Sequence, residues 1–165
     1  MHTLACICDY RKESIPATSI APCDYVSTEN MLPNRAGVTP AASTPSAGSV
    51  SLYEKGDVLI SNIRPYFKKI WLADRDGGCS NDVLVVKPTH CDSDYLYWVL
   101  SSDSFFKYMT ATSKGTKMPR GDKNSIMRFP LRNMSERDRS TLSSILNPIQ
   151  RKIALNNRIN DYLVA

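Results

Sequence analysis

The chain has 165 residues, of which 42% are hydrophobic, and it carries a net charge of +5 with an isoelectric point near 9.0. This size allows one compact domain with a substantial core and an appendage, and the basic balance indicates an acidic partner, either nucleic acid or an anionic membrane. No apolar run reaches the roughly 18 residues of a membrane span, and the first residues lack the basic and apolar regions of a signal peptide, so we expect neither feature.

The five cysteines are scattered along the chain, without the CxxC spacing of a zinc site. His2, Cys6 and Cys8 lie close together in the sequence but match no ligand pattern. The pair His90-Cys91 matches none either. We therefore expect no bound metal, reduced and partly buried thiols, and a cytoplasmic location.

The first half of the chain predicts short strands. Residues 24–33 predict a strand that runs into a turn, and the prolines and small residues of 38–50 predict a surface loop. Residues 56–72 predict two strands around a bend at Arg64-Pro65, because short apolar runs lie on both sides of the bend. Residues 82–86 predict a further core strand. Together these segments indicate a small twisted β-sheet.

The second half mixes a helix with short elements. Residues 94–109 predict one helix, because apolar residues recur there every three to four positions. Residues 126–130 predict a short edge strand that ends at Pro130. The fold class is therefore α+β, a mixed α/β globular domain over residues 1–134 with a long helix after it.

The segment from Thr112 to Lys123 is a basic loop. It holds four basic residues, and Gly115, Pro119 and Gly121 exclude a long helix or a central strand. Between residues 107 and 132, seven basic residues and one acidic residue give a local charge of +6, whereas the whole chain carries only +5. The positive field therefore comes from one place, and the loop is suited to a phosphate backbone.

Residues 135–165 predict a long amphipathic helix. Ser135 is a candidate N-cap with an acid three residues later. Pro148 should kink the helix or divide it, since an interior proline costs roughly 3 kcal/mol. A wide apolar stripe on such a helix indicates a partner helix and a coiled-coil-type dimer, unless the helix folds back on its own domain. The residues of this stripe are Leu142, Ile145, Leu146, Ile149, Ile153, Asn156, Ile159 and Leu163.

Residues for catalysis are scarce. The chain has two histidines, His2 and His90, and it contains neither a GxGxxG nor a GxxxxGK[ST] phosphate loop nor an HExxH motif. The string KGTK at 114–117 lacks the strand and the spacing of a Walker loop. These observations predict a binding module rather than an enzyme.

Five segments, in order, resemble the specificity subunits of type I restriction-modification enzymes. Any one string is a weak signal, but together they cover nearly the whole chain. They are YVSTENMLPN at 25–34, GDVLISNIRPYFKKIW at 56–71, CSNDVLVVKP at 79–88, KGTKMPRGDKNSIMRFPL at 114–131 and RKIALNNRIN at 151–160.

The resemblance implies a DNA-binding subunit without its own chemistry. In that family, target-recognition domains alternate with long helices, each domain reads one half of a bipartite DNA sequence, and the helices pair as a spacer. The implied partners are double-stranded DNA, methyltransferase subunits and a restriction and translocase subunit. S-adenosylmethionine, ATP and magnesium would belong to those subunits and not to this chain.

The usual subunit has two recognition domains and two helical regions, whereas this chain has one of each. It could therefore be a half-subunit that forms a homodimer, a fragment, or a recombination cassette.

Candidate DNA contacts follow from the basic loop and from the resemblance. Residues 38–50 or 88–95 could instead read the bases that set specificity, because strings shared between subunits of different specificity cannot set specificity themselves. Two other functions stay open: a protein-interaction module that docks on a methyltransferase, and a small nuclease. The candidate DNA-binding residues are Ser61, Asn62, Arg64, Tyr66, Lys68, Lys69, Lys114, Thr116, Lys117, Arg120 and Lys123.

Overall fold

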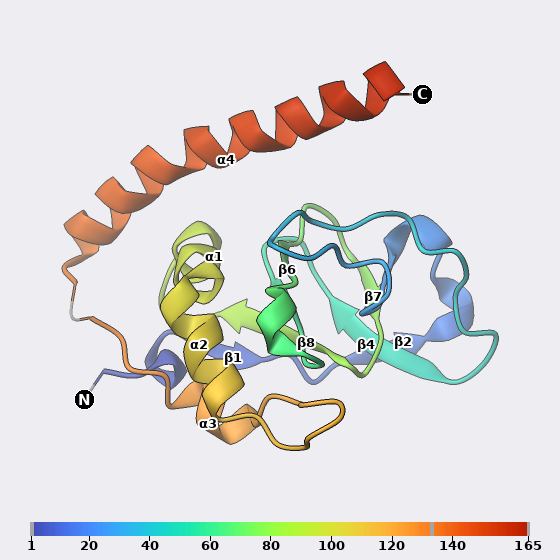
Figure 1. The fold of residues 1–165 in the computed structure, drawn as a ribbon, viewed down its shortest axis with the longest axis horizontal. Helices are drawn as coiled ribbons and strands as arrows, with labels where there is room; N and C mark the ends of the chain where they lie inside the picture. Colours follow the sequence, from blue (N-terminus) through green and yellow to red (C-terminus); the bar gives the residue numbers. More distant parts are fainter. Residues whose placement is uncertain (1, 133, 165) are drawn as a thin grey trace. The chain divides into compact units, whose positions relative to one another are not determined.

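The computed structural model describes residues 2–132 and 134–164. The chain divides into two compact units, Met1–Leu131 and Arg132–Ala165 (Figure 1). The first unit holds the sheets and the short helices, and the second holds one long helix.

The first unit contains two four-stranded sheets, where the sequence predicted one. In the first sheet every pairing is antiparallel, in the order β1 (Cys8–Tyr10), β8 (Val83–Pro88), β5 (Val58–Ser61) and β6 (Ile70–Leu72). The predicted strands at 56–72 and 82–86 are therefore confirmed, and they are neighbours in this sheet.

The second sheet was not anticipated, because three of its four strands have only two or three residues. Its order is β2 (Ser14–Pro16), β4 (Ser49–Tyr53), β7 (Gly77–Cys79) and β3 (Tyr25–Val26). The pairing of β3 with β7 is parallel, and the other two are antiparallel. Runs of two or three residues carry too little period-2 pattern to be recognised in a sequence.

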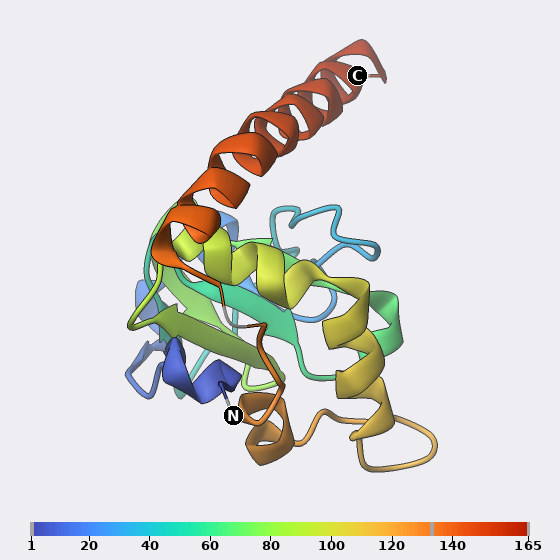
Figure 2. The ribbon, with the colours of Figure 1, turned by 90° about the vertical axis from the view of Figure 1, so that its left-hand side faces the viewer.

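The central strands β5 and β8 are buried on both faces. All four residues of β5 are buried, as are the first four of β8. Successive side chains of a strand point to opposite faces, so each strand contributes to two sides. One side packs toward residues of the second sheet, and α1 (Ser93–Ser101) packs against the first sheet (Figure 2). The core between the sheets comprises Val26, Met31, Tyr53, Leu59, Ala73, Cys79, Val83 and Val85.

The predicted helix at 94–109 is wrong in one respect, because it is two helices. α1 ends at Ser101, and α2 (Asp103–Ala111) begins after Ser102. Ser102 has an extended backbone, and its Oγ accepts a hydrogen bond from the Phe105 N–H at 3.2 Å. This N-cap satisfies one of the free N–H groups of α2, which favours a new helix start over a continuous helix. The remaining short helices are α3 (Lys123–Met127), η1 (Leu4–Cys6), η2 (Ala17–Ser19), η3 (Pro22–Asp24) and η4 (Pro65–Phe67).

The predicted edge strand at 126–130 is wrong. Residues Lys123–Met127 form α3, whose N-cap Asp122 accepts a hydrogen bond from the Ser125 N–H at 2.8 Å. Only Pro130 has extended pairing, in an isolated antiparallel bridge with Thr3. A capping aspartate therefore outweighs the apolar run that favoured a strand.

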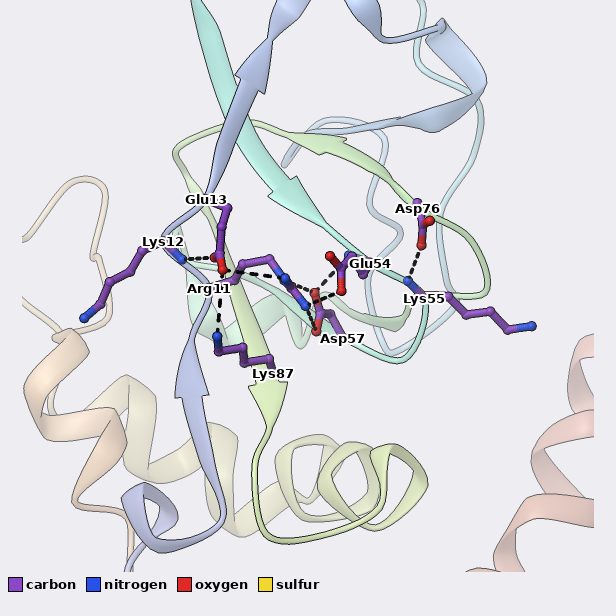
Figure 3. A network of polar contacts seen from close by, with 8 residues as sticks. All are labelled: Arg11, Lys12, Glu13, Glu54, Lys55, Asp57, Asp76 and Lys87. Carbon is purple, nitrogen blue, oxygen red and sulfur yellow. Dashed lines mark hydrogen bonds and ion pairs between the residues drawn. The ribbon is translucent and has the colours of Figure 1, made fainter.

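An ion-pair network centred on the buried pair of Arg11 and Asp57 lies where the chain crosses between the two sheets (Figure 3). The guanidinium of Arg11, 10% exposed, bonds to Asp57 at 2.5 Å and to Glu54 at 2.9 Å. Asp57 is 4% exposed and also accepts the Glu54 N–H at 2.9 Å. The hydrogen bond to Asp57 raises the pKa of Arg11. The ends of β1, β4 and β5 are thereby joined at one point.

The second unit is the helix α4 (Glu136–Val164), which has 29 residues. The predicted N-cap is confirmed, since Ser135 Oγ accepts a hydrogen bond from the Asp138 N–H at 3.1 Å. The helix runs through Pro148, so the predicted division is wrong, and the kink stays a prediction. Among the described residues, no helix is apolar over a length that would cross a membrane.

Candidate nucleic-acid interface

Two distant sequence segments meet at one surface of the first unit. The turn between β5 and β6 contains η4, and the basic loop connects α2 to α3 (Figure 1). Two backbone hydrogen bonds join them: the Arg64 N–H donates to the Pro119 carbonyl at 2.8 Å, and the Gly121 N–H donates to the Asn62 carbonyl at 3.1 Å. The strings SNIRPYFKK and GTKMPRGDK, predicted separately to bind DNA, therefore form a single surface.

The basic loop is closed at its base. Lys114 and Arg120 exchange two backbone hydrogen bonds, each 2.8 Å long. Residues 115–119 form the tip, and Gly115 supplies a left-handed backbone with φ of +93°. Thr116, Lys117 and Met118 are exposed on this tip. The loop is thus a defined projection from the surface of the unit.

A cleft of about 440 Å³ lies between the turn and the loop. Three of its lining residues are cationic and one is a carboxylate, so its net charge is positive. The lining residues are Thr28, Ser61, Ile63, Arg64, Phe67, Lys69, Asp82, Met118 and Arg120.

Ser61 and Asn62, both predicted to contact DNA, hold the turn. Ser61 is 2% exposed, and its Oγ donates to the Ile63 carbonyl at 3.0 Å. Asn62 Oδ1 is buried and has no hydrogen-bond partner within the described part of the chain. A Cβ at Gly121 would lie 2.9 Å from this oxygen, so the absence of a side chain there allows the loop to approach the turn.

Lys68 and Lys69 have different settings. Lys68 Nζ donates to Asp103 Oδ1 at 2.7 Å, and Arg35 binds the same carboxylate. The hydrogen bonds from Lys68 and Arg35 lower the pKa of Asp103 to about 2. Lys68 thus ties the turn to α2. Lys69 donates to the Thr28 carbonyl at 2.6 Å and lines the cleft.

Two of the loop cations have carboxylate partners. Arg120 pairs with Asp82 at 3.0 Å, and Lys114 pairs with Asp122 at 2.7 Å. The hydrogen bond from Lys114 and the Ser125 N–H hold the pKa of Asp122 well below its usual range. Both cations stay largely accessible, with side chains that are 56% and 81% exposed.

The other predicted contacts face solvent. Arg64, Tyr66 and Lys117 are exposed, and neither Arg64 nor Lys117 has an ion-pair partner among the residues that the structure describes. Lys123 is also exposed, and its Nζ lies 5.8 Å from the ring centroid of Tyr10. These cations are the ones most available to an anionic ligand.

Sequence reasoning missed several residues that shape this surface. Arg35, Asp82 and Asp103 gave no local signal, because each acts through a partner that is distant in the sequence. Phe67 and Met118 did give a signal, since each is a large apolar residue within a loop rich in cations.

On α4 the predicted stripe is largely exposed, except that Leu142 and Leu146 are half-buried. Ile145 is 58% exposed, Ile149 is 52% exposed and Ile153 is 48% exposed. The same holds further along the helix for Asn156, Ile159 and Leu163. The side chain of Asn157, another residue of the helix string, lies outside the described residues.

Metal ligands do not gather anywhere in residues 2–132 and 134–164, since no three His, Cys, Asp or Glu side chains lie close enough to share an ion. All five cysteines are free thiols. Burial raises the pKa of Cys8 and of Cys79 to about 12, so both are poor ligands and nucleophiles.

Solved structures of type I restriction-modification proteins share this fold. A protein from a study of the assembly and conformational transition of the type I R-M system aligns over 98% of this chain and 44% of its own, with a TM-score of 0.66 and 20% identity. The HsdS subunit of Thermoanaerobacter tengcongensis aligns over 97% and 44%, with a TM-score of 0.63 and 16% identity. The S subunit of the M. genitalium type I system aligns over 91% and 38%, with a TM-score of 0.63 and 13% identity.

No protein-family profile matches the chain, and no curated protein is significantly similar to it in sequence. The solved structures nevertheless agree with the resemblance indicated by the five strings, because the fold of this chain is that of type I specificity subunits. The chain spans less than half the length of each solved protein, at 44%, 44% and 38%.

Proposed function

We propose that the chain is a DNA-recognition component of a type I restriction-modification system. In this proposal the first unit binds one half of a bipartite DNA target, and α4 pairs with a second helix as a spacer. The observation that carries the proposal is the fold shared over 98% of the chain with a protein of a type I R-M system.

The chemistry of the cleft supports DNA as the ligand. Arg64, Lys117 and Lys123 are exposed cations on the turn, the loop and the start of α3. Lysine and arginine bind phosphates and release counterions, which gives affinity without sequence preference. Arginine can also bind the O6 and N7 atoms of guanine through two hydrogen bonds, which gives sequence preference. Arg64 and Arg120, at the rim of the cleft, are the candidates for that role.

The exposed apolar stripe on α4 supports a two-copy assembly, because such a stripe needs a partner helix. Each copy would supply one recognition unit for one half of a bipartite target. Two copies related by a two-fold axis would read two identical half-sites in inverted orientation. We propose that α4 makes this homodimer, with the two helices antiparallel.

The proposed role requires no reaction on this chain. Methylation and cleavage would be carried out by methyltransferase subunits and a restriction and translocase subunit. S-adenosylmethionine, ATP and magnesium would be held by those subunits.

The direct test is selection from a randomised duplex pool by the purified full chain, followed by sequencing, with and without a type I methyltransferase subunit. Enrichment of an inverted repeat by the chain alone is the expected result. Enrichment of a single half-site would keep the DNA-binding role but contradict the homodimer. If no sequence is enriched under either condition, the proposed function is wrong.

The dimer has its own test. Replacing Ile149 and Ile153 together by aspartate places two charges on the apolar stripe, so the dimer should dissociate into monomers in sedimentation velocity. Ser144→Asp and Arg151→Asp together are the matched control, because both exposed residues lie on the face of the helix opposite the stripe. An unchanged species in the isoleucine variant would mean that the stripe packs elsewhere.

A second function is favoured by the exposed stripe itself. An apolar stripe on a separate helix is also the surface that a methyltransferase-docking adaptor would need. That adaptor would have negligible DNA affinity alone, and its weak binding would not depend on salt. A salt titration of DNA binding therefore separates the two functions.

A further inference from the structure

Exposed apolar side chains on the first unit are confined to one place. Within residues 2–131, the large hydrophobic side chains that stand exposed are Tyr66 at 48%, Phe67 at 40% and Met118 at 49%. The first two lie on η4 and the third lies at the tip of the basic loop. The other large apolar residues of the unit are buried or half-buried, so this small exposed patch is a feature of the cationic surface rather than a general property.

Two of the three patch residues line the cationic cleft. Phe67 and Met118 both line it, together with Arg64, Lys69 and Arg120. The rings of Tyr66 and Phe67 contact each other, with centroids 4.8 Å apart. A ligand that covers these residues must bring negative charge and a flat apolar surface within one cleft. Duplex DNA offers both, since phosphates flank the faces of stacked bases.

The backbone holds the aromatic turn rigidly. Arg64 and Lys68, which flank η4, are left-handed with φ of +50° and +51°. Asn34 and Arg35 are also left-handed, with φ of +55° and +65°. They donate backbone hydrogen bonds to the carbonyls of Phe67 at 2.8 Å and Lys68 at 3.0 Å.

These four are the non-glycine residues of positive φ in residues 2–132 and 134–164, and all of them lie at this turn. Strained backbone persists only where the surroundings fix it, and it concentrates at functional sites. The turn is further fixed to the basic loop by the Arg64 to Pro119 hydrogen bond and to α2 by the ion pair of Lys68 with Asp103. Phe67 is thus presented on a prearranged support.

We propose that Phe67 and Met118 form an apolar wedge that enters a base step of the bound DNA and partly unstacks it. This inference rests on the proposed function, because it requires a bound duplex. Arg64, Lys69 and Arg120 would contact the phosphates on either side of the opened step. Pyrimidine–purine steps unstack most easily, so the wedge adds a preference for a flexible step at a fixed position in the half-site.

The experiment uses the full chain and the duplex enriched in the selection. The adenine analogue 2-aminopurine, placed at successive positions, fluoresces more strongly where its stacking is lost. The fluorescence of 2-aminopurine at one of these positions should rise when the chain binds the duplex. The Phe67→Ala and Met118→Ala double variant should lose that rise and bind about tenfold more weakly, since base–aromatic contacts contribute at this level.

Two variants make the result specific. Phe67→Trp retains a large flat ring and should keep the fluorescence rise. Lys117→Ala should weaken binding, yet at saturating protein the rise should stay the same. Both target exposed side chains, and melting temperatures verify that each variant is folded.

The other outcomes overturn the inference. A wild-type chain that binds its duplex tightly without brightening any position would leave the proposed function intact and remove the wedge. If the double variant binds and brightens as the wild type does, the patch serves a protein partner instead. If no duplex is bound at all, the proposed function and the wedge fail together.

Discussion

Two charged regions of the first unit use the same residue types for opposite purposes. Around Arg11 the central charges are buried and paired, because the guanidinium binds Asp57 in the interior, while Glu54 and Glu13 approach it from the exposed edge. At the cleft the charges are exposed and unbalanced, because three cations face a single carboxylate, Asp82. A buried ion pair such as Arg11 with Asp57 holds the fold together, whereas an exposed excess of one sign is free to bind a ligand.

A count of charges in the sequence shows where a cationic surface lies, but not which of its cations have carboxylate partners. The local charge of +6 between residues 107 and 132 correctly indicated a cationic surface. It did not separate Lys117, which has no ion-pair partner among the described residues, from Lys114, which pairs with Asp122. Whether a cation is available to a ligand depends on the side chains that lie beside it in the folded chain.

The largest effect is expected in the buried network. Asp57→Ala would leave the Arg11 guanidinium buried without its nearest carboxylate, so the free energy of unfolding should fall by about 3–5 kcal/mol. Denaturant unfolding measures this change. Lys12→Ala, at an exposed neighbour, should alter it very little. The DNA affinity of the molecules that remain folded should not change, and a loss of affinity would contradict a purely structural role.

A smaller effect, on binding alone, is expected at the tip of the loop. Lys117→Ala removes an exposed phosphate contact, so affinity should fall about equally for all sequences. The slope of log K against log salt should decrease by about one. Fluorescence anisotropy over a range of salt concentrations measures both. A loss for one sequence with an unchanged slope would mean that Lys117 reads a base.

Removing the negative charge of the cleft should strengthen DNA binding, which is the opposite of the effect expected for Lys117→Ala. Asp82→Asn removes a negative charge from beside Arg120 and keeps the shape of the side chain, so DNA should bind about threefold more tightly, the scale of an exposed ion pair. Asp76→Asn, at an exposed turn, serves as the control. Weaker binding in the Asp82 variant would show that the ion pair orients Arg120 for the DNA.

The smallest effect concerns the support of the turn, and it depends on pH. The pKa of Asp103 is lowered from 3.8 to about 2 by Lys68 and Arg35. Its contribution to stability is therefore complete above the ordinary pKa and is lost as the pH falls toward 2. Asp103→Asn should lower the melting temperature slightly at neutral pH, and the difference should disappear as the pH falls through 2. A difference that persists in acid would mean that the variant acts through another contact.

Local pattern was sufficient for the elements with strong signals. The strands β5 and β8 were predicted because each contains a buried apolar run, of three residues in β5 and four in β8. The start of α4 was predicted because Ser135 and Asp138 form a cap from neighbouring residues. The break at Ser102 and the helix α3 were missed, since a capping side chain there competes with an apolar pattern that favours a different element.

For the candidate site, the composition of Thr112–Lys123 was enough to predict a cationic loop, because charge and chain breakers are properties of adjacent residues. The partners of those cations depend on contacts between segments that the sequence keeps apart. Lys68 meets Asp103 across 35 residues, and Arg120 meets Asp82 from another strand connection. The folding of the two sheets brings the turn and the loop together, so it also selects which cations stay available and where Phe67 and Met118 are exposed.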